Sequence, residues 1–251
     1  MSKATIRQQF GSHASAYVNS ETHARGASLQ RLIDLVQPQP DWHALDIATG
    51  AGHTALAFAP YLAYVTATDI TPQMLQQAQK LAADRHLSNI TIETADAEAL
   101  PYHDDSFDLV TCRIAPHHFN DIPLFLAGST RVLRQGGLLA VVDNIVPAGP
   151  AGDYVNAFEK LRDPSHNRCL SGEEWITAFQ AAGLSILHHE ILAKTMDFDF
   201  WAKRHDQTMQ SYLLAMLSEA SGASAQFLQP QITATGSTFT LSEVLFVTQK
   251  T

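Results

Sequence analysis

The chain has 251 residues, enough for one large domain that buries a substantial core. Its 45% hydrophobic and 16% charged residues argue against disorder, and its net charge of −9 disfavours binding to a phosphate backbone. No apolar run approaches the roughly 18 residues of a membrane span, residues 1–17 lack a signal-peptide core, and two cysteines, Cys112 and Cys169, make no disulfide framework. We therefore expect a soluble, cytoplasmic protein with no membrane span and no nucleic-acid partner.

The first half of the chain alternates predicted strands and helices. Apolar positions at helical spacing predict a helix that ends near Gln37, before Pro38 and Pro40. There follow, in chain order, a strand at 44–48, a helix at 53–62, a strand at 64–69, a helix from 71, strands at 90–95 and 107–112, a helix at 123–133 and a strand at 138–142. Such alternation predicts a parallel sheet with helices on both faces.

The second half follows this rhythm less closely. A loop at 144–152 precedes a mostly helical segment at 153–182, a strand at 184–191, a helix at 198–217, a Ser/Gly/Ala linker at 218–225 and a last strand at 239–248. We predict an α/β fold of Rossmann-like, doubly wound type, with a seven-stranded, mostly parallel sheet and a helical lid or insertion in the C-terminal half. The whole chain, 1–251, is expected to form a single domain.

A glycine-rich turn lies between the first strand of this core and the next helix. Gly50 and Gly52 would let a ligand approach the backbone, and the helix start offers unpaired N–H donors. Extended to Ala55, the turn fits the dinucleotide fingerprint G-x-G-x-x-G/A, and Asp69 lies 19 residues after Gly50, where a ribose-binding acid belongs. The turn therefore favours a nucleoside-containing cofactor over a purely structural role.

Carboxylates at three strand regions narrow the choice of cofactor. Asp46 lies in the first strand, Asp69 ends the second and Asp96 follows the third, so all three are expected at the ligand crevice of the sheet. A pyrophosphate is repelled by such an acidic crevice, whereas S-adenosylmethionine carries a sulfonium and an ammonium group. The acids thus favour the methyl donor over NAD or NADP.

Four ordered motifs resemble those of the class I S-adenosylmethionine-dependent methyltransferases. They read LDIATGAGHT at 45–54, TDITPQML at 68–75, DAEALP at 96–101 followed by SFDLV at 106–110, and RVLRQGG at 131–137. The chain is most similar to the small-molecule branch around the ubiquinone/menaquinone C-methyltransferases, in which the run His117-His118-Phe119 recurs. One departure is Ala48, where many members have glycine; alanine is tolerated if the backbone there has a negative φ, so we count this departure as minor.

The resemblance implies an N-terminal helical cap at 1–40, a cofactor-binding core at 41–143 and substrate-side helices with the last two strands at 144–251. It implies that Asp46 holds the methionine ammonium, Asp69 the ribose hydroxyls and Asp96 the adenine amino group. The remaining implied cofactor contacts come from the glycine-rich turn, the adenine side and the methionine end: Ala48, Thr49, Gly50, Ala51, Gly52, Ile70, Met74, Ala97, Cys112, Arg113 and Tyr17.

Candidates for the chemistry follow the fourth and fifth strands. His117 or His118 would be a general base near neutral pH, although one could simply pack under the cofactor while the other is solvated. Arg113 would orient an anionic group or be structural, and Asp143 and Asn144 would face the acceptor unless Asp143 is only a cap. The neighbouring histidines at 188–189 point to opposite sides of a strand and are interpreted as structural; with no metal-binding spacing in the sequence, we expect no metal.

The expected reaction is methyl transfer to a small acceptor, at carbon or oxygen. The aromatic segment 198–201, with later apolar residues up to 216, would form either a lid over an apolar or aromatic acceptor or ordinary helical core, the commoner explanation. An NAD(P)-dependent oxidoreductase and an S-adenosylmethionine-binding protein without methyl transfer are the alternatives. A nucleic-acid methyltransferase is disfavoured, because Arg113 to His117 does not form an Asn-Pro-Pro-Tyr type motif.

Overall fold

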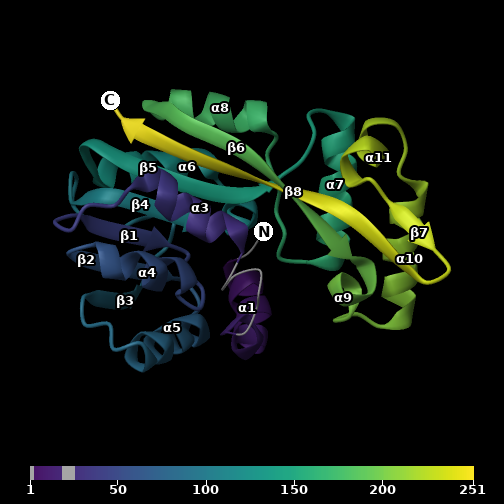
Figure 1. Ribbon diagram of the computed structural model, residues 1–251, viewed down its shortest axis with the longest axis horizontal. Helices are drawn as coiled ribbons and strands as arrows, with labels where there is room; N and C mark the ends of the chain where they lie inside the picture. The colour runs from purple at the N-terminus through teal and green to yellow at the C-terminus, as the bar shows by residue number, and fades with distance from the viewer. Residues whose placement is uncertain (1–2, 19–25) are drawn as a thin grey trace.

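The computed structural model describes residues 3–18 and 26–251, and it contains one eight-stranded sheet (Figure 1). The order β3-β2-β1-β4-β5-β8-β6 has parallel pairs from β3 to β5, whereas β8 is antiparallel to both β5 and β6. The bounds are β1 (His43–Ile47), β2 (Tyr64–Asp69), β3 (Ile90–Thr94), β4 (Phe107–Arg113), β5 (Leu133–Ile145), β6 (Leu184–Asp197), β7 (Gln231–Thr233) and β8 (Gly236–Lys250). The predicted doubly wound, mostly parallel sheet is confirmed; the extra strand, β7, is a three-residue hairpin partner of β8.

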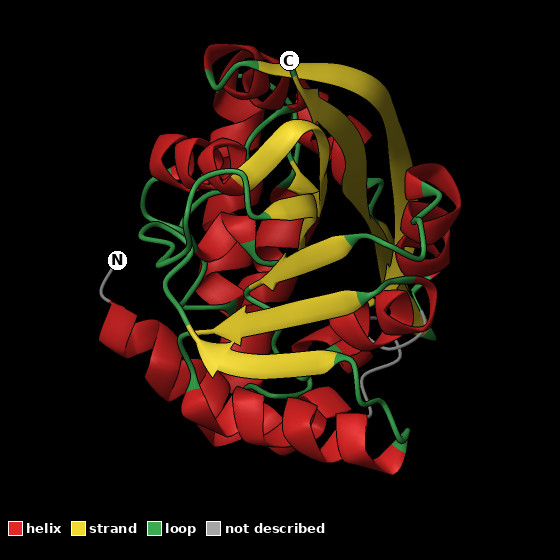
Figure 2. Cartoon of the chain, turned by 90° about the vertical axis from the view of Figure 1, so that its left-hand side faces the viewer, coloured by secondary structure: helices red, strands yellow, loops and turns green. Residues whose placement is uncertain are grey.

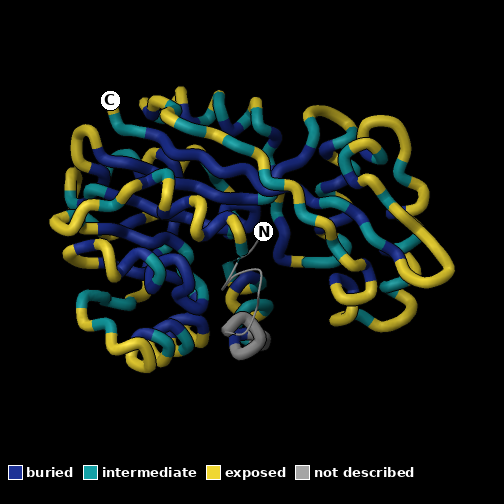
Figure 3. The backbone as a smooth tube through the Cα atoms, in the orientation of Figure 1, coloured by how far each residue is buried: buried dark blue, intermediate teal, exposed yellow. Residues whose placement is uncertain are grey.

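Helices cover both faces of this sheet (Figure 2). On one face, α3 (Ala27–Val36) and α4 (His53–Phe58), which continues as the short helix η1 (Ala59–Tyr61), pack over β1, β2 and β5. On the other face, α6 (Ile122–Val132) and α8 (Gly172–Ala181) pack over β4, β5 and β8. The central strands are buried along most of their length, which explains their nearly continuous apolar sequences (Figure 3).

A third hydrophobic core lies in the C-terminal half. It joins α7 (Pro150–Arg162), α9 (Phe198–Ala202), α10 (Gln207–Glu219) and α11 (Gly222–Leu228) to the distal parts of β6 and β8. These two strands, of 14 and 15 residues, run on past the rest of the sheet and carry the helices with them (Figure 1). The third core is therefore built on the same strands as the main sheet.

Two sequence predictions in this half are wrong. The helix expected at 198–217 is two helices, because the carboxylate of Asp206 accepts a hydrogen bond from Met209 N (2.9 Å) and so starts α10 anew. The expected linker at 218–225 contains the start of α11, where the Ser224 hydroxyl bonds the backbone of Ser221 and Leu228 is buried in the third core. The small polar residues of this segment gave no sign of a helix in the sequence. The helix is stabilised by the burial of its last turn, not by the helix propensity of its residues.

The N-terminal helix α1 (Lys3–Val18) packs against α5 (Pro72–Asp84), the helix after β2. Arg7 Nε donates to the Ile70 carbonyl (3.0 Å), and the Lys3 ammonium forms ion pairs with Asp96 and Glu98. These contacts hold α1 beside the carboxyl ends of the parallel strands. None of the described helices is long and apolar enough to cross a membrane.

Candidate active site

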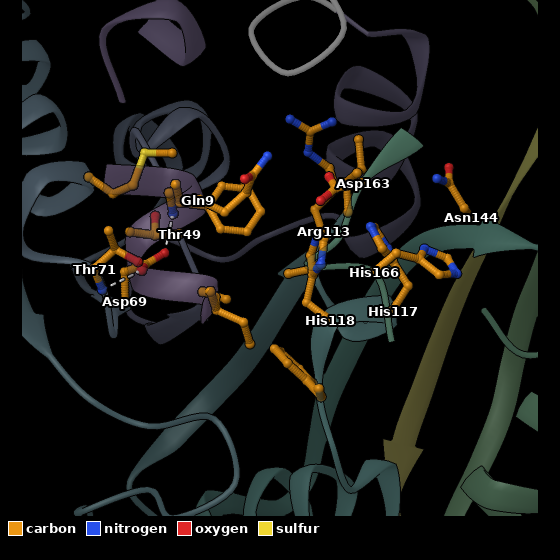
Figure 4. A pocket seen from close by; sticks show the side chains of 18 of the residues that line it. Gln9, Thr49, Asp69, Thr71, Arg113, His117, His118, Asn144, Asp163 and His166 are labelled. Carbon is orange, nitrogen blue, oxygen red and sulfur yellow. Dashed lines mark hydrogen bonds between the residues drawn. The ribbon is translucent and has the colours of Figure 1, made fainter. Parts of the chain in front are cut away.

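A cavity of about 780 Å³ lies at the carboxyl ends of the parallel strands, where open α/β sheets bind their ligands. Figure 4 shows Thr49, Asp69 and Thr71 at one end of the cavity and His117 and His166 at the other. We refer to these as the Asp69 end and the His117 end. Residues of α1 form part of the wall.

The glycine-rich turn brings the backbone of Gly50 to the Asp69 end. Gly50 has φ +56°, and a Cβ placed there would meet no atom within 4 Å, so the space in front of the turn is open. Gly52 has φ +90° and faces the other way: a Cβ there would lie 3.0 Å from the Cβ of Ala78 in α5. The first glycine thus leaves room for a ligand, and the second allows α5 to pack closely.

 One expectation is wrong: alanine at residue 48 was counted as a minor departure on the condition that φ there is negative, but the φ of Ala48 is +53°, in the left-handed region. A Cβ in this conformation costs about 1–2 kcal/mol, a cost that glycine would avoid. The alanine is therefore a source of local strain rather than a neutral replacement.

Asp46 is buried beneath this turn. Its carboxylate accepts hydrogen bonds from the hydroxyls of Thr111 (2.6 Å) and Thr49 (2.5 Å) and from the N–H of Ala55 (3.2 Å). Burial raises the pKa of Asp46 to about 6, although these hydrogen bonds and the nearby charge of Arg113 lower it in part. Asp46 therefore ties β1 to β4 and to the glycine-rich turn while it lines the cavity.

Asp69 and Asp96 present carboxylates at the same end. Asp69 accepts hydrogen bonds from the N–H groups of Gly50 (3.0 Å) and Thr71 (2.8 Å), and burial raises its pKa although these bonds oppose the shift. Asp96 accepts from the N–H of Glu98 (3.0 Å) and pairs with Lys3 of α1. The sequence predicted both carboxylates at this site, but it did not predict the ion pair between Asp96 and Lys3 of α1.

His117 lies at the opposite end, in the short helix η2 (Pro116–His118) after β4. Its Nδ1 is 2.5 Å from Oδ1 of Asp143, a residue of β5 that is almost fully buried. Burial alone would lower the pKa of His117, but the charge of Asp143 and this hydrogen bond, with smaller effects of Glu159 and Asp163, raise it above its ordinary value. His117 is thus a buried imidazole held by a carboxylate.

Two further imidazoles surround His117. The ring of His118 lies 4.1 Å away and that of His166 lies 5.5 Å away, centroid to centroid. Burial, together with the charge of His117, lowers the pKa of each to about 3, so both are neutral near pH 7. The sequence suggested His117 and His118 as alternative candidates for the general base. Their surroundings distinguish them, because the pKa of His117 is raised and that of His118 is lowered.

Most of the predicted site residues line this cavity. Those that do are Asp46, Ala48, Thr49, Gly50, Ala51, Asp69, Ile70, Met74, Asp96, Ala97, Arg113, His117, His118 and Asn144. Gly52 and Cys112 do not; the Cys112 side chain is fully buried in the core of the sheet. Asp143 acts from behind His117, and the side chain of Tyr17 lies outside the described residues.

Several charged residues of the cavity were not predicted from the sequence. Glu159 and Arg162 come from α7, Asp163 and His166 from the loop after it, and Lys194 and Glu243 form an ion pair between β6 and β8. No motif marks them, because they come from segments far apart in the chain. One signal was available in the sequence: Glu159 is an acidic residue at a position that the apolar pattern of α7 places on its buried face.

The aromatic segment 198–201 is divided between the two expected roles. Phe200 lines the cavity, Phe198 packs in the third core, and Trp201 does both. Leu213 of α10 also lies in that core, and Tyr212 is exposed. On β6, the ring of His189 stacks on Phe246, as expected for a structural histidine.

The residues at the Asp69 end fit S-adenosylmethionine. Open space lies before Gly50, and the carboxylates of Asp46, Asp69 and Asp96 suit a cationic ligand with hydroxyl and amino donors. Between the two ends, Arg113 is buried, and its Nε donates to the Thr54 hydroxyl (3.0 Å). The cavity thus has a mainly acidic end, whose residues fit the cofactor, and an end that contains histidines.

Comparisons with known proteins agree with this geometry. Residues 45–141 match a family model described as a methyltransferase domain. The uncharacterized methyltransferase YcgJ of Bacillus subtilis is 37% identical over 201 residues, which cover 80% of this chain and 79% of YcgJ. The ubiquinone/menaquinone biosynthesis C-methyltransferase UbiE of Paracoccus denitrificans is 40% identical over 116 residues, or 45% of this chain and 46% of UbiE.

Solved structures extend the similarity to most of the chain. A Bacillus halodurans structure assigned as a methyltransferase, BH2331, aligns with a TM-score of 0.86 and 30% identity, covering 90% of this chain and 99% of that one. The structure of YcgJ aligns with a TM-score of 0.83 and 33% identity, covering 89% and 97%. The methyl donor is therefore favoured over a dinucleotide, and the oxidoreductase alternative is set aside. The chain belongs to the S-adenosylmethionine-dependent methyltransferases.

Proposed function

We propose that the protein transfers a methyl group from S-adenosylmethionine to carbon or oxygen of a small aromatic acceptor, with His117 as the general base. The observation that carries this proposal is the buried pair of His117 and Asp143 at the far end of the cofactor cavity. The rings of Phe10, Phe119 and Trp201 also line the cavity and suit an aromatic acceptor. Relatives named as C-methyltransferases support methylation at carbon.

The cofactor would lie at the Asp69 end. Asp69 would accept hydrogen bonds from the ribose hydroxyls, and Ile70 and Met74 would pack against the adenine. Asp96 would accept from the adenine amino group. Asp46, whose oxygens already accept three hydrogen bonds, would act on the methionine ammonium mainly through its charge.

His117 is suited to remove a proton because Asp143 determines which of its two ring nitrogens is protonated. With Nδ1–H donating to Asp143, Nε2 carries the lone pair that accepts a proton from the acceptor. Asp143 then stabilises the imidazolium that forms. His118 is a poor base by comparison, because a pKa of about 3 leaves it little affinity for a proton near pH 7.

The cofactor supplies an electrophilic methyl group on a positively charged sulfur. The protein has to bring the nucleophile close to that methyl group and keep water out. Helix α1 contributes Ile6, Gln9 and Phe10 to the wall and so helps to enclose the cavity. The positive charge of the sulfonium would be spread over the methyl group and the acceptor in the transition state, which a desolvated site favours.

The test is product formation from S-adenosylmethionine and a panel of small aromatic acceptors, detected as a gain of one methyl group by mass spectrometry. The substitution His117→Gln should lower the rate by about 10²–10⁴-fold while calorimetry shows unchanged cofactor binding. The matched control is His103→Gln, an exposed histidine that does not line the cavity.

The two results that contradict the proposal differ. An unaffected rate in the His117→Gln variant would exclude His117 as the base while leaving methyl transfer in place. Tight binding of S-adenosylmethionine without product from any acceptor would favour the alternative, a protein that binds the cofactor and does not transfer the methyl group.

A further inference from the structure

Glu159 of α7 is a buried carboxylate that the proposed reaction does not use. It lines the cavity, its residue is only 8% exposed, and its Oε1 atom has no hydrogen-bond partner among the described residues. Burial raises its pKa, and the positive charges of Arg162 and His117 oppose that shift. A buried acceptor without a donor destabilises the fold. We therefore expect Glu159 to have a role other than stabilising the fold.

The two neutral histidines beside His117 also present hydrogen-bond acceptors. Nδ1 of His118 lies 2.8 Å from the Ser165 carbonyl, which can only accept, so this nitrogen carries the proton and Nε2 does not. Nε2 of His166 lies 2.8 Å from Oδ1 of Asn156. That oxygen is an acceptor as well, because it also receives the N–H of Cys169 (2.7 Å), so Nδ1 of His166 is unprotonated.

Although the cations Arg162, Lys194 and Arg204 also line the cavity, the wall beside His117 includes three residues that accept hydrogen bonds: Glu159 through its carboxylate, and His118 and His166 through one ring nitrogen each. All three residues line the same cavity. A purely apolar acceptor would leave these groups without donors once water is displaced. An acceptor with an O–H or N–H group would supply the missing donor.

We propose that Glu159, with the neutral imidazoles of His118 and His166, forms a hydrogen-bond-accepting subsite that selects methyl acceptors carrying an O–H or N–H group. This inference rests on the proposed function, since it places the acceptor at the His117 end. Glu159 is the specificity-determining residue of this subsite. It discriminates by charge and geometry and does not take part in the transfer itself.

The test uses the full chain saturated with S-adenosylhomocysteine and three probes of similar size. Phenol carries an O–H donor, aniline an N–H donor, and anisole neither. Binding is measured by NMR titration of the histidine ring protons. We expect phenol or aniline to bind about tenfold or more tightly than anisole, as for a hydrogen bond to a charged group; the better of the two identifies the donor.

Two substitutions separate hydrogen bonding from charge. Glu159→Leu should abolish the preference over anisole, whereas Glu159→Gln keeps an accepting oxygen and should retain most of it. Both should lower the pKa of His117, because both remove the negative charge. The control is Glu219→Leu at the exposed end of α10, which should change neither the preference nor the titration.

Two outcomes would overturn the inference. Equal affinity of the wild-type protein for all three probes would refute the selective subsite and leave the proposed methyl transfer standing. Failure of every probe to bind, with S-adenosylhomocysteine bound normally, would also refute the placement of the acceptor beside His117. Because the wild-type comparison needs no variant, a folding defect in Glu159→Leu would not prevent the test.

Discussion

The substitution Asp143→Asn tests the central pair of the site. It keeps the size of the side chain but removes the charge that faces Nδ1 of His117 at 2.5 Å. Asp143 is 1% exposed, so solvent screens this interaction little. The other groups that face His117, namely Glu159, Asp163 and the neutral rings of His118 and His166, stay in place.

The expected size of the effect follows from the strength of this contact. A hydrogen bond to a charged group contributes about 1.5–3 kcal/mol, which corresponds to about one to two pKa units. Burial already lowers the pKa of His117, so without Asp143 it should fall below the ordinary value of 6.5. A weaker and less well oriented base should also reduce the limiting rate, by about tenfold or more.

The assay is the pH dependence of kcat/KM, together with the NMR titration of His117. In the wild type the reaction needs neutral His117, so the rate should rise with pH through a midpoint above 6.5. In Asp143→Asn the midpoint should move down by about one to two units. The same pair stabilises the fold below pH 6.5, a contribution that is lost as pH rises through the raised pKa.

An unchanged midpoint in the variant would refute the assignment of His117 as the titrating base. The control is Asp108→Asn, at the start of β4, whose partly exposed carboxylate pairs with Arg134 and does not line the cavity. It should leave the midpoint where it is. A shift of the same size in this control would show that the profile reports overall charge rather than the contact with His117.

Three further predictions concern the cofactor and stability. Asp69→Ala should weaken S-adenosylmethionine binding by about tenfold or more, since it removes a charged acceptor; unchanged affinity in calorimetry would contradict the assignment of Asp69 to the ribose. Ala48→Gly should raise the unfolding free energy by about 1 kcal/mol, because φ is +53° there; a loss of stability in denaturant titration would argue against strain at this position. Glu159→Leu should stabilise the fold by about 1–3 kcal/mol, since Oε1 is buried without a partner, and a lower Tm would show that Glu159 supports the fold after all.

The Asp69 end of the cavity could be predicted from the sequence because its residues are local. The glycine-rich turn, Asp69 and Asp96 each follow a strand directly, and the carboxyl ends of parallel strands meet at one edge of the sheet. Spacing along the chain therefore translates into proximity in space. The two strand-end acids and Gly50 line the cavity as this rule requires.

The dihedral angle φ of Ala48 could not be predicted from the spacing of residues along the chain. A short strand followed by a glycine-rich turn is compatible with either sign of φ at residue 48, and the packing of the turn against β2 determines which occurs. Thr49 N donates to the Thr68 carbonyl (2.8 Å), and this contact between neighbouring strands fixes the path of the chain. Strain of this kind is visible only in the assembled sheet.

The sequence by itself thus determined the fold class, the type of cofactor and most residues that line the Asp69 end of the cavity, because hydrophobic period and turn chemistry are local. At the His117 end the sequence offered His117, His118 and Asp143 as candidates, but their contacts were decided by the tertiary structure. His117, Asp143 and Glu159 come from η2, β5 and α7, and only the crossing of these elements makes one histidine basic and leaves its neighbours neutral. The burial of a side chain and the charges near it depend on all the elements that pack around it, and the spacing of residues in the sequence does not encode this packing.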